Sequence, residues 1–257
     1  MAILPTTRYD WYKRAVITNE LGQVIGAPVE GWTRRADPPS DAMNGRHCRL
    51  ERLDPDRHCA QLHAHNRLDV EGRNWTYLPY GPFTSVEEHH AWATAMAAPD
   101  DPQFWAVIDL STGEATGVAS FLRIDPGVGV IEVGHINFSP TLQRTVAATE
   151  AMHLMMRRVF DELGYRRYEW KCDALNAPSR AAAQRLGFTY EGVFRQATIY
   201  KGRNRDTAWY SILDVEWPAI DRAMRAWLDP SNFDAGGRRH LPLAELRTGA
   251  PDRPRPI

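Results

Sequence analysis

The sequence predicts a mixed α/β fold, in which helices cover a β-sheet of parallel and antiparallel strands. Residues 104–138 read as three short strands joined by tight turns, which is typical of an antiparallel meander. On either side of this meander, helical periodicity alternates with strand periodicity. The motifs of several other folds are missing. Gly127-x-Gly129 lacks a third glycine and a following helix, and the sequence contains no Walker motif and no Gly-x-Ser-x-Gly.

Composition narrows the possible partners and compartments. The 257 residues carry a formal net charge of −1, so no strong field attracts nucleic acid or an anionic membrane. There is no run of 18 apolar residues and no export signal at the start of the sequence. The three cysteines include no Cys-x-x-Cys pair, which favours free thiols in a reducing cytoplasm. The spacing of His58, His63 and His65 does not suit a metal ion on one helix face, so we expect no metal site.

Local signals place the elements in order. Asp54 followed by Pro55 predicts a helix start, and Thr84 or Ser85 predicts another. A longer helix carries apolar residues at helical spacing from Ala148 to Leu163 and stops at Gly164. The predicted strands are 46–53, 104–108, 115–124, 130–138, 168–173, 188–192, 195–200 and 207–216. The predicted helices are 54–65, 84–98, 139–163, 176–186 and 218–228.

The ends of the chain differ from the middle. Residues 1–45 are rich in proline and lack periodicity, so we interpret them as an N-terminal extension. Residues 46–216 form the predicted main domain. Residues 217–257 contain a closing helix, then a proline- and arginine-rich tail that we expect to be exposed and partly disordered after Leu228. The closing helix with Trp217 and Trp227, together with the proline-rich arms, suggests a contact in a homodimer.

Three motifs, taken together, indicate the kind of site that this sequence forms. A strand, a tight loop and a helix start span residues 132–151, and backbone N–H groups at such a helix start can bind phosphate. Asn176-Ala177-Pro178-Ser179 and Arg185-Leu186-Gly187-Phe188 follow in the next strand–helix–strand unit. In this order and spacing, residues 46–216 resemble the GCN5-related N-acetyltransferase (GNAT) family, and within it the ribosomal-protein N-terminal acetyltransferase branch.

The resemblance implies a seven-stranded mixed sheet with a V-shaped opening between strands 130–138 and 168–173. Acetyl-coenzyme A (acetyl-CoA) lies in this opening in the family. The cofactor-binding residues implied for this sequence are Asn137, Phe138, Ser139, Gln143, Arg144, Thr145, Val146, Ala147, Ala148, Asn176 and Ser179.

The pyrophosphate loop departs from the family pattern. The family usually carries Arg/Gln-x-x-Gly-x-Gly/Ala there, whereas this sequence has Arg144 and Val146 where glycines are common. Glycine tolerates positive φ and lets the backbone approach a ligand closely. Either the charge of Arg144 compensates at the pyrophosphate, or cofactor affinity is weakened or lost.

The resemblance also implies catalytic candidates. The tyrosine that protonates the leaving thiolate in many members is replaced here by Ala183, so Ser179 is the candidate acid and Glu191 the candidate base. Glu132 and His135 on the preceding strand are rival bases. The alternatives are that Ser179 only caps its helix, that Glu191 only pairs with a nearby arginine, and that His135 is a packed histidine.

The acceptor pocket of the family is built by the first helices, their loop and the last hairpin. The corresponding residues are Trp75, Tyr77, Tyr80, Phe83, Tyr200 and Arg203, with Arg205 beside them. Aromatic walls with arginines suit an amine that bears a carboxylate, although the rings can equally be core.

These motifs and the family resemblance together predict an enzyme that transfers acetyl from acetyl-CoA to a primary amine by direct attack in a ternary complex. The amine is an amino acid, a small amine or a protein N-terminus. Two alternatives remain open at this point. One is a non-catalytic coenzyme A sensor on the same scaffold, and the other is the same enzyme with a succinyl-type donor.

Overall fold

A computed structural model describes residues 16–248, and its contacts divide the chain into two units at Arg34 and Arg35. The first unit contains an antiparallel hairpin of β1 (Val16–Thr18) and β2 (Val24–Gly26). This hairpin was not predicted, because strands of three residues are too short to show a period. The proline-rich end predicted at 251–256 lies outside the described residues.

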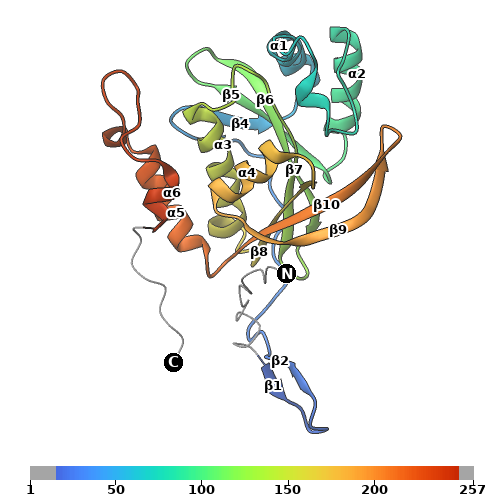
Figure 1. Ribbon diagram of the computed structural model, residues 1–257, viewed down its shortest axis with the longest axis vertical. Helices are drawn as coiled ribbons and strands as arrows, with labels where there is room; N and C mark the ends of the chain where they lie inside the picture. Colours follow the sequence, from blue (N-terminus) through green and yellow to red (C-terminus); the bar gives the residue numbers. More distant parts are fainter. Residues whose placement is uncertain (1–15, 249–257) are drawn as a thin grey trace, which may run out of the picture. The chain divides into compact units, whose positions relative to one another are not determined.

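The second unit is built on one eight-stranded sheet with the order β3-β4-β5-β6-β7-β8-β10-β9 (Figure 1). Its strands are β3 (Met43–Asn44), β4 (Cys48–Arg52), β5 (Gln103–Asp109), β6 (Glu114–Asp125), β7 (Val130–Phe138), β8 (Arg167–Asp173), β9 (Thr189–Tyr200) and β10 (Arg203–Leu213). Only β7 and β8 pair in parallel, and every other pair is antiparallel. The mixed sheet is confirmed, with the short edge strand β3 as an eighth member.

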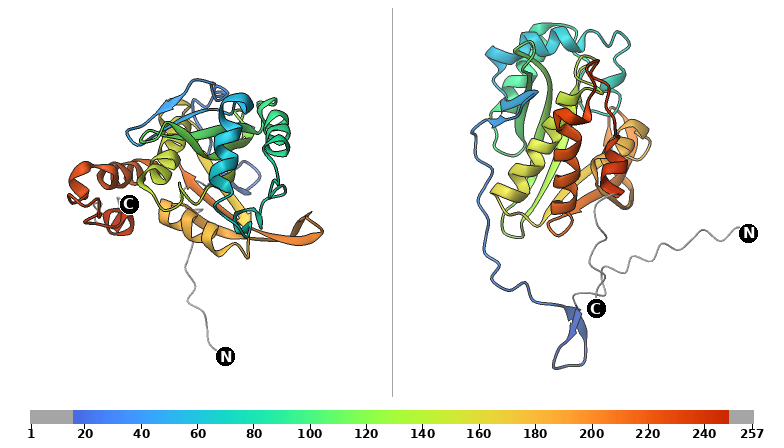
Figure 2. Two further views of the ribbon diagram at one scale, coloured as in Figure 1. Left: turned by 90° about the horizontal axis from the view of Figure 1, so that it is seen from above. Right: turned by 90° about the vertical axis from the view of Figure 1, so that its left-hand side faces the viewer.

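Helices cover both faces of this sheet. On one face, α1 (Pro55–Asn66) and α2 (Val86–Ala97) pack over a cluster that includes Phe104 and Val118. The other face carries α3 (Val146–Arg157), α4 (Ala177–Leu186) and α5 (Trp217–Leu228) over the larger core. Figure 2 shows α3 and α5 side by side on that face. A π-helical turn (Arg158–Glu162) continues α3, and the 3-10 turns Arg73–Trp75 and Pro230–Asn232 lie in loops.

Helix starts follow the predicted capping chemistry. The Asp54 side chain accepts hydrogen bonds from the N–H groups of Asp56 and Arg57, and Ser85 Oγ accepts one from Glu88 N–H. Asn176 Oδ1 accepts from Ser179 N–H at 3.1 Å. Such caps satisfy N–H groups that have no partner inside the helix, which is why these helices begin where the sequence predicts.

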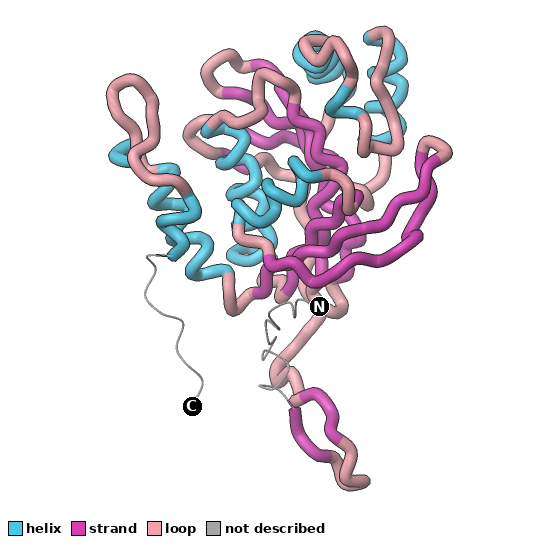
Figure 3. Tube along the Cα trace, in the orientation of Figure 1, coloured by secondary structure: helices cyan, strands magenta, loops and turns pink. Residues whose placement is uncertain are grey.

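Two predictions about the end of the domain were wrong. Segments 188–192 and 195–200 form the single strand β9, which makes a long hairpin with β10 (Figure 3). The segment after Leu228 is not simply exposed, because α6 (Leu243–Thr248) places Leu243 in the core. Trp217 and Trp227 are likewise buried inside the chain's own core, so neither ring is available for the dimer contact suggested from the sequence.

A buried carboxylate ties α3 to the edge of the sheet. Glu150 accepts hydrogen bonds from three consecutive backbone N–H groups, those of Arg46, His47 and Cys48, at 2.9, 2.6 and 2.9 Å. An ionised carboxylate that receives three N–H donors makes a strong contact, because each bond is charge-assisted. This contact holds the helix that begins just after residue 145 in register with β4.

Other features of the second unit agree with its composition. Cys48, Cys59 and Cys172 are free thiols, as predicted, and all three are buried. Among the described residues, no helix has the length and apolar character required to cross a membrane.

Candidate functional site

The two central parallel strands, β7 and β8, are hydrogen-bonded to each other along only the first part of their length. Pairing between β7 and β8 runs from Val130–Arg167 to Val133–Trp170 and then stops. Beyond that point, β7 remains paired with β6 as far as Phe138, and β8 remains paired with β10 as far as Asp173. The facing edges of residues 134–138 and 171–173 therefore have no strand between them, which is the V-shaped opening predicted from the sequence.

A bulge in β7 lies just beyond the point of separation. His135 has a φ of 50°, and the register between β6 and β7 shifts between Val118 and Ser120. Bulges redirect side chains and interrupt pairing, and they are common beside active sites. The main-chain N–H and C=O groups on this edge can pair with an extended ligand that carries amides, as in the addition of a strand to a sheet edge.

The loop before α3 forms a helix N-terminus despite its missing glycines. Thr145 caps the helix, and its Oγ1 accepts from Ala148 N–H at 3.1 Å. Val146 is the first helical residue and needs no positive φ, whereas Arg144 adopts the left-handed conformation with a φ of 65°. The first N–H groups of a helix lack partners within it, so those of Val146 and Ala147 are available to an anion.

Side chains brace this loop against the end of β7. Gln143 Nε2 donates to Phe138 C=O and to Asn74 Oδ1, both at 2.8 Å. Within the described residues, two buried polar atoms at the end of β7 lack a hydrogen-bond partner, namely Asn137 Nδ2 and Ser139 Oγ. Unsatisfied buried polar atoms are costly. They suit a site that receives a polar ligand, and the opening, the free N–H groups and these atoms together fit acetyl-CoA.

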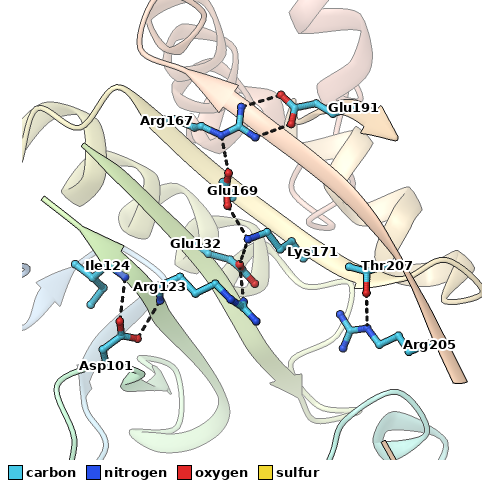
Figure 4. Close-up of polar contacts among 10 residues, drawn as sticks. All are labelled: Asp101, Arg123, Ile124, Glu132, Arg167, Glu169, Lys171, Glu191, Arg205 and Thr207. Carbon is cyan, nitrogen blue, oxygen red and sulfur yellow. Dashed lines mark hydrogen bonds and ion pairs between the residues drawn. The ribbon is translucent and has the colours of Figure 1, made fainter. Parts of the chain in front are cut away.

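A chain of ion pairs crosses the α1/α2 face of the sheet beside the opening (Figure 4). Glu132 Oε2 lies 2.7 Å from the Arg123 guanidinium and 2.8 Å from Lys171 Nζ. The chain continues from Lys171 to Glu169 at 2.8 Å, and from Glu169 to Arg167 at 2.6 Å. Arg167 then donates two hydrogen bonds to the Glu191 carboxylate, of 2.8 and 2.5 Å.

Two candidate bases belong to this chain of ion pairs, and their pKa values are shifted in opposite directions. Glu132 is 3% exposed, and burial raises its pKa more than Lys171 and Arg123 lower it. Hydrogen bonds from Arg167 lower the pKa of Glu191, against the opposing effect of partial burial. Glu132 lies next to Val133, where the strands separate, whereas β8 and β10 separate Glu191 from β7.

His135 is a neutral side chain at the opening. Burial, with the positive charges of Arg123 and Arg205, lowers its pKa to about 4. Its Nδ1 lies 3.2 Å from Tyr80 Oη, and the two rings stack with centroids 5.7 Å apart. A neutral imidazole has one donor nitrogen and one acceptor nitrogen, so Nδ1 either accepts the Tyr80 hydroxyl proton or donates to the Tyr80 oxygen.

Ser179 lies on the other side of the opening, at the start of α4. Its Oγ accepts a hydrogen bond of 3.0 Å from the indole N–H of Trp170, the last paired residue of β8. Burial raises the pKa of the Cys172 thiol and a hydrogen bond with the Ser179 hydroxyl opposes this rise, so Ser179 also contacts Cys172. Ala183, at the position of the family's tyrosine, is fully buried, so α4 supplies no phenol here.

The predicted acceptor residues gather where the β9–β10 hairpin meets the aromatic loop. Lys201 Nζ donates to the carbonyls of Trp75 and Gly81, at 2.9 and 2.7 Å, and Arg203 donates to Thr76 C=O at 2.6 Å. Tyr77 Oη donates to Leu175 C=O, and Tyr200 Oη donates to Asp173 Oδ2.

The rings themselves divide into two groups. Trp75 is buried beneath the loop, which matches the alternative that this ring is core, whereas Phe83 packs edge-on against it and is half-buried. Tyr80 and Tyr200 are half-buried and reach His135 and Asp173.

Sequence reasoning missed Lys171, Arg123 and Arg167 as members of the site. The available signal was the alternation of 167, 169 and 171 along one strand, which places three charged side chains on one face. That pattern was used only to predict the strand. Lys171 is held further by the Trp209 ring, whose centroid is 3.8 Å from Nζ.

Comparisons with known proteins agree with this geometry. Residues 48–189 match the family model described as an acetyltransferase (GNAT) domain. A crystal structure of a GCN5-related N-acetyltransferase from Brucella melitensis is 46% identical, with a TM-score of 0.84 over 86% of this chain and 100% of that chain. A probable acetyltransferase of the GNAT family from Chromobacterium violaceum ATCC 12472 is 41% identical, with a TM-score of 0.70 over 76% and 96% of the two chains.

More distant relatives are also N-acetyltransferases or share the same fold. An uncharacterized N-acetyltransferase of Bacillus subtilis (strain 168), YnaD, is 28% identical over 145 residues, which cover 55% of this chain and 81% of that protein. The ribosomal L7/L12 N-acetyltransferase RimL, solved in complex with coenzyme A, shares the fold at 22% identity and a TM-score of 0.57. The matched domain spans more than half of the sequence and includes β7, β8 and the loop before α3. The chain therefore belongs to the GNAT acetyltransferase family.

Proposed function

We propose that this GNAT N-acetyltransferase acetylates a primary amine, which attacks the thioester of acetyl-CoA directly in a ternary complex. The parting of β7 and β8 after Val133 and Trp170, beside a capped helix N-terminus, is the observation that carries the proposal. The family's donor, acetyl-CoA, supplies an activated acetyl group when it is bound.

In this proposal, two groups of residues hold the donor. The main chain of Asn137, Phe138 and Ser139 binds its amide-bearing arm, since this edge of β7 has no strand partner. The N–H groups at the start of α3 and the side chain of Arg144 bind its pyrophosphate.

The acceptor amine must lose a proton before it can attack. A free alkyl ammonium has a pKa of roughly 10, so it needs both a base and surroundings that disfavour positive charge. Arg123 and Arg205 provide such surroundings, since their charge contributes to the lowered pKa of His135. We assign the base to Glu132, acting directly or through one water, because it is buried, has a raised pKa and lies at the point of separation.

The leaving thiolate must then gain a proton. We assign this acid to Ser179, whose hydroxyl lies at the start of α4 and contacts Trp170, the last paired residue of β8. In this proposal Glu191 does not take the proton. It orients Arg167 through two hydrogen bonds and thereby holds the ion-pair chain in place.

The remaining sequence-based expectations stand as proposals. The acceptor is an amino acid, a small amine or a protein N-terminus, and the acyl group is acetyl rather than succinyl. Residues 46–216 form the acyltransferase domain, the protein acts in the cytoplasm without nucleic acid or membrane, and a homodimer remains a proposal without an assigned contact.

The test of the proposed function has two stages. Excess acetyl-CoA should raise the melting temperature of the full chain, because a ligand that binds only the folded state stabilises it by mass action. Incubation with acetyl-CoA and a panel of amino acids, polyamines and short peptides should then release free thiol above the rate of hydrolysis. An unchanged melting temperature would refute the proposal, and so would binding without turnover on every amine, which is the behaviour of a sensor.

A further inference from the structure

Arg205 lies on the α1/α2 face of the sheet, and among the described residues it has no carboxylate partner. On that face, Arg123 and Lys171 pair with Glu132, and Arg167 pairs with Glu169 and Glu191. The ammonium of Lys201 and the guanidinium of Arg203 are held by backbone carbonyls. Arg205 makes one side-chain hydrogen bond, from Nε to Thr207 Oγ1 at 3.2 Å.

That single bond orients the guanidinium group. Because Nε is held by Thr207, the two terminal nitrogens of Arg205 remain free to donate. The planar pair of terminal nitrogens matches the two oxygens of a carboxylate. Arg205 is half-buried, and its guanidinium carbon lies 5.9 Å from the centroid of the Tyr200 ring, so the group is supported on one side by an aromatic surface.

The position of Arg205 links it to the reacting centre. Figure 4 shows its guanidinium extended from β10 toward the part of the sheet that carries Arg123 and Glu132. Its charge acts on His135 of β7 and also on Cys172 of β8, which are residues on the two arms of the opening. The group therefore lies on the same face of the sheet as the ion-pair chain and acts on residues of both strands that border the opening.

The nearby carboxylates do not compete for this guanidinium. Asp173, at the end of β8, accepts hydrogen bonds from Tyr200 Oη and from Leu175 N–H. Glu132, Glu169 and Glu191 are each engaged by cations of the ion-pair chain. An anionic group supplied by a ligand has no internal rival for Arg205 among the described residues.

We propose that the guanidinium of Arg205 binds a carboxylate on the acceptor. The preferred substrates are then amines that carry a free carboxylate, as α-amino acids do. The inference rests on the proposed function and narrows it, because amines without a negative group become poor acceptors. Tyr200 lies beside Arg205, and Tyr80 contacts His135.

The test compares acceptors that differ only in this charge. L-phenylalanine is paired with L-phenylalaninamide, and L-leucine with L-leucinamide, in the thiol-release assay. For each pair, the ratio of kcat/KM between acid and amide is compared between the wild type and Arg205→Gln. The difference in amine basicity is the same for both proteins, so it cancels. Arg195→Gln serves as a matched control, because Arg195 is an exposed arginine on β9 of the same hairpin.

The expected result is that Arg205→Gln lowers the acid-to-amide ratio by roughly tenfold or more, mainly through KM, as for loss of a charge-assisted hydrogen bond. Arg195→Gln should leave the ratio unchanged, and acetyl-CoA should raise the melting temperature of all three proteins equally. An unchanged ratio in Arg205→Gln, an equal loss in Arg195→Gln, or wild-type turnover restricted to amines without a carboxylate would overturn the inference while leaving acetyl transfer intact. Absence of acetyl-CoA binding would instead indicate failure of the proposed function itself.

Discussion

Replacing Glu132 with glutamine is expected to lower kcat by roughly 10²–10⁴-fold, the usual contribution of a general base. Glutamine keeps the shape of the side chain but cannot take a proton. In the wild type, kcat/KM should fall as the pH drops through the raised pKa of Glu132, because only the ionised carboxylate is a base. That acidic limb should disappear in Glu132→Gln. The measurement is a pH profile of thiol release with acetyl-CoA and the best acceptor amine.

Glu191→Gln is the matched control for this prediction. It also changes a carboxylate to an amide in the same ion-pair chain, since it weakens the two hydrogen bonds from Arg167. Its effect on kcat should stay below about tenfold, because the side chain orients the chain of charges without receiving the proton. A larger loss of kcat in Glu191→Gln than in Glu132→Gln would transfer the role of base to Glu191.

Arg144→Glu is expected to raise the Kd for coenzyme A by about 100-fold, because a charge-assisted contact is lost and a repulsive one replaces it. Arg144 is exposed and already has a φ of 65°, so the substitution adds no new backbone strain. A glutamate just before a helix start also interacts favourably with the helix dipole, so the fold should be preserved. Isothermal titration with coenzyme A measures the effect, and the melting temperature of the free protein checks the fold.

A truncated donor separates this effect from general damage. S-acetylpantetheine carries the thioester and the amides but no pyrophosphate, so its KM should be the same for the wild type and Arg144→Glu. If the KM for the truncated donor rises as much as the Kd for coenzyme A, the loop before α3 is not the pyrophosphate site.

Most of the fold was predictable because its signals are local. The capping residues Asp54, Ser85 and Asn176 mark helix starts, and β7 begins and ends at the predicted residues. The errors occur where tertiary contacts decide. The strand β9 continues through residues 193–194, which were expected to interrupt it, because pairing with β10 supports it there. The helix α6 forms where Leu243 reaches the core, and no local pattern reveals that contact.

The candidate site was predictable in outline and not in detail. The motifs located the opening, the helix start and the set of possible bases. They could not rank Glu132 against Glu191, because burial and partners depend on how strands far apart in sequence are ordered in the sheet. The loop before α3 illustrates the same limit. Arg144 takes the left-handed conformation that a glycine was expected to supply, and Val146 simply begins the helix.

A crystal structure of the full chain grown with coenzyme A tests the central claim most directly. The account predicts the pantetheine arm between residues 134–138 of β7 and 171–173 of β8, hydrogen-bonded to the main chain of β7, with the pyrophosphate at the start of α3. Strands β7 and β8 paired along their full length, or coenzyme A bound away from this opening, would contradict it.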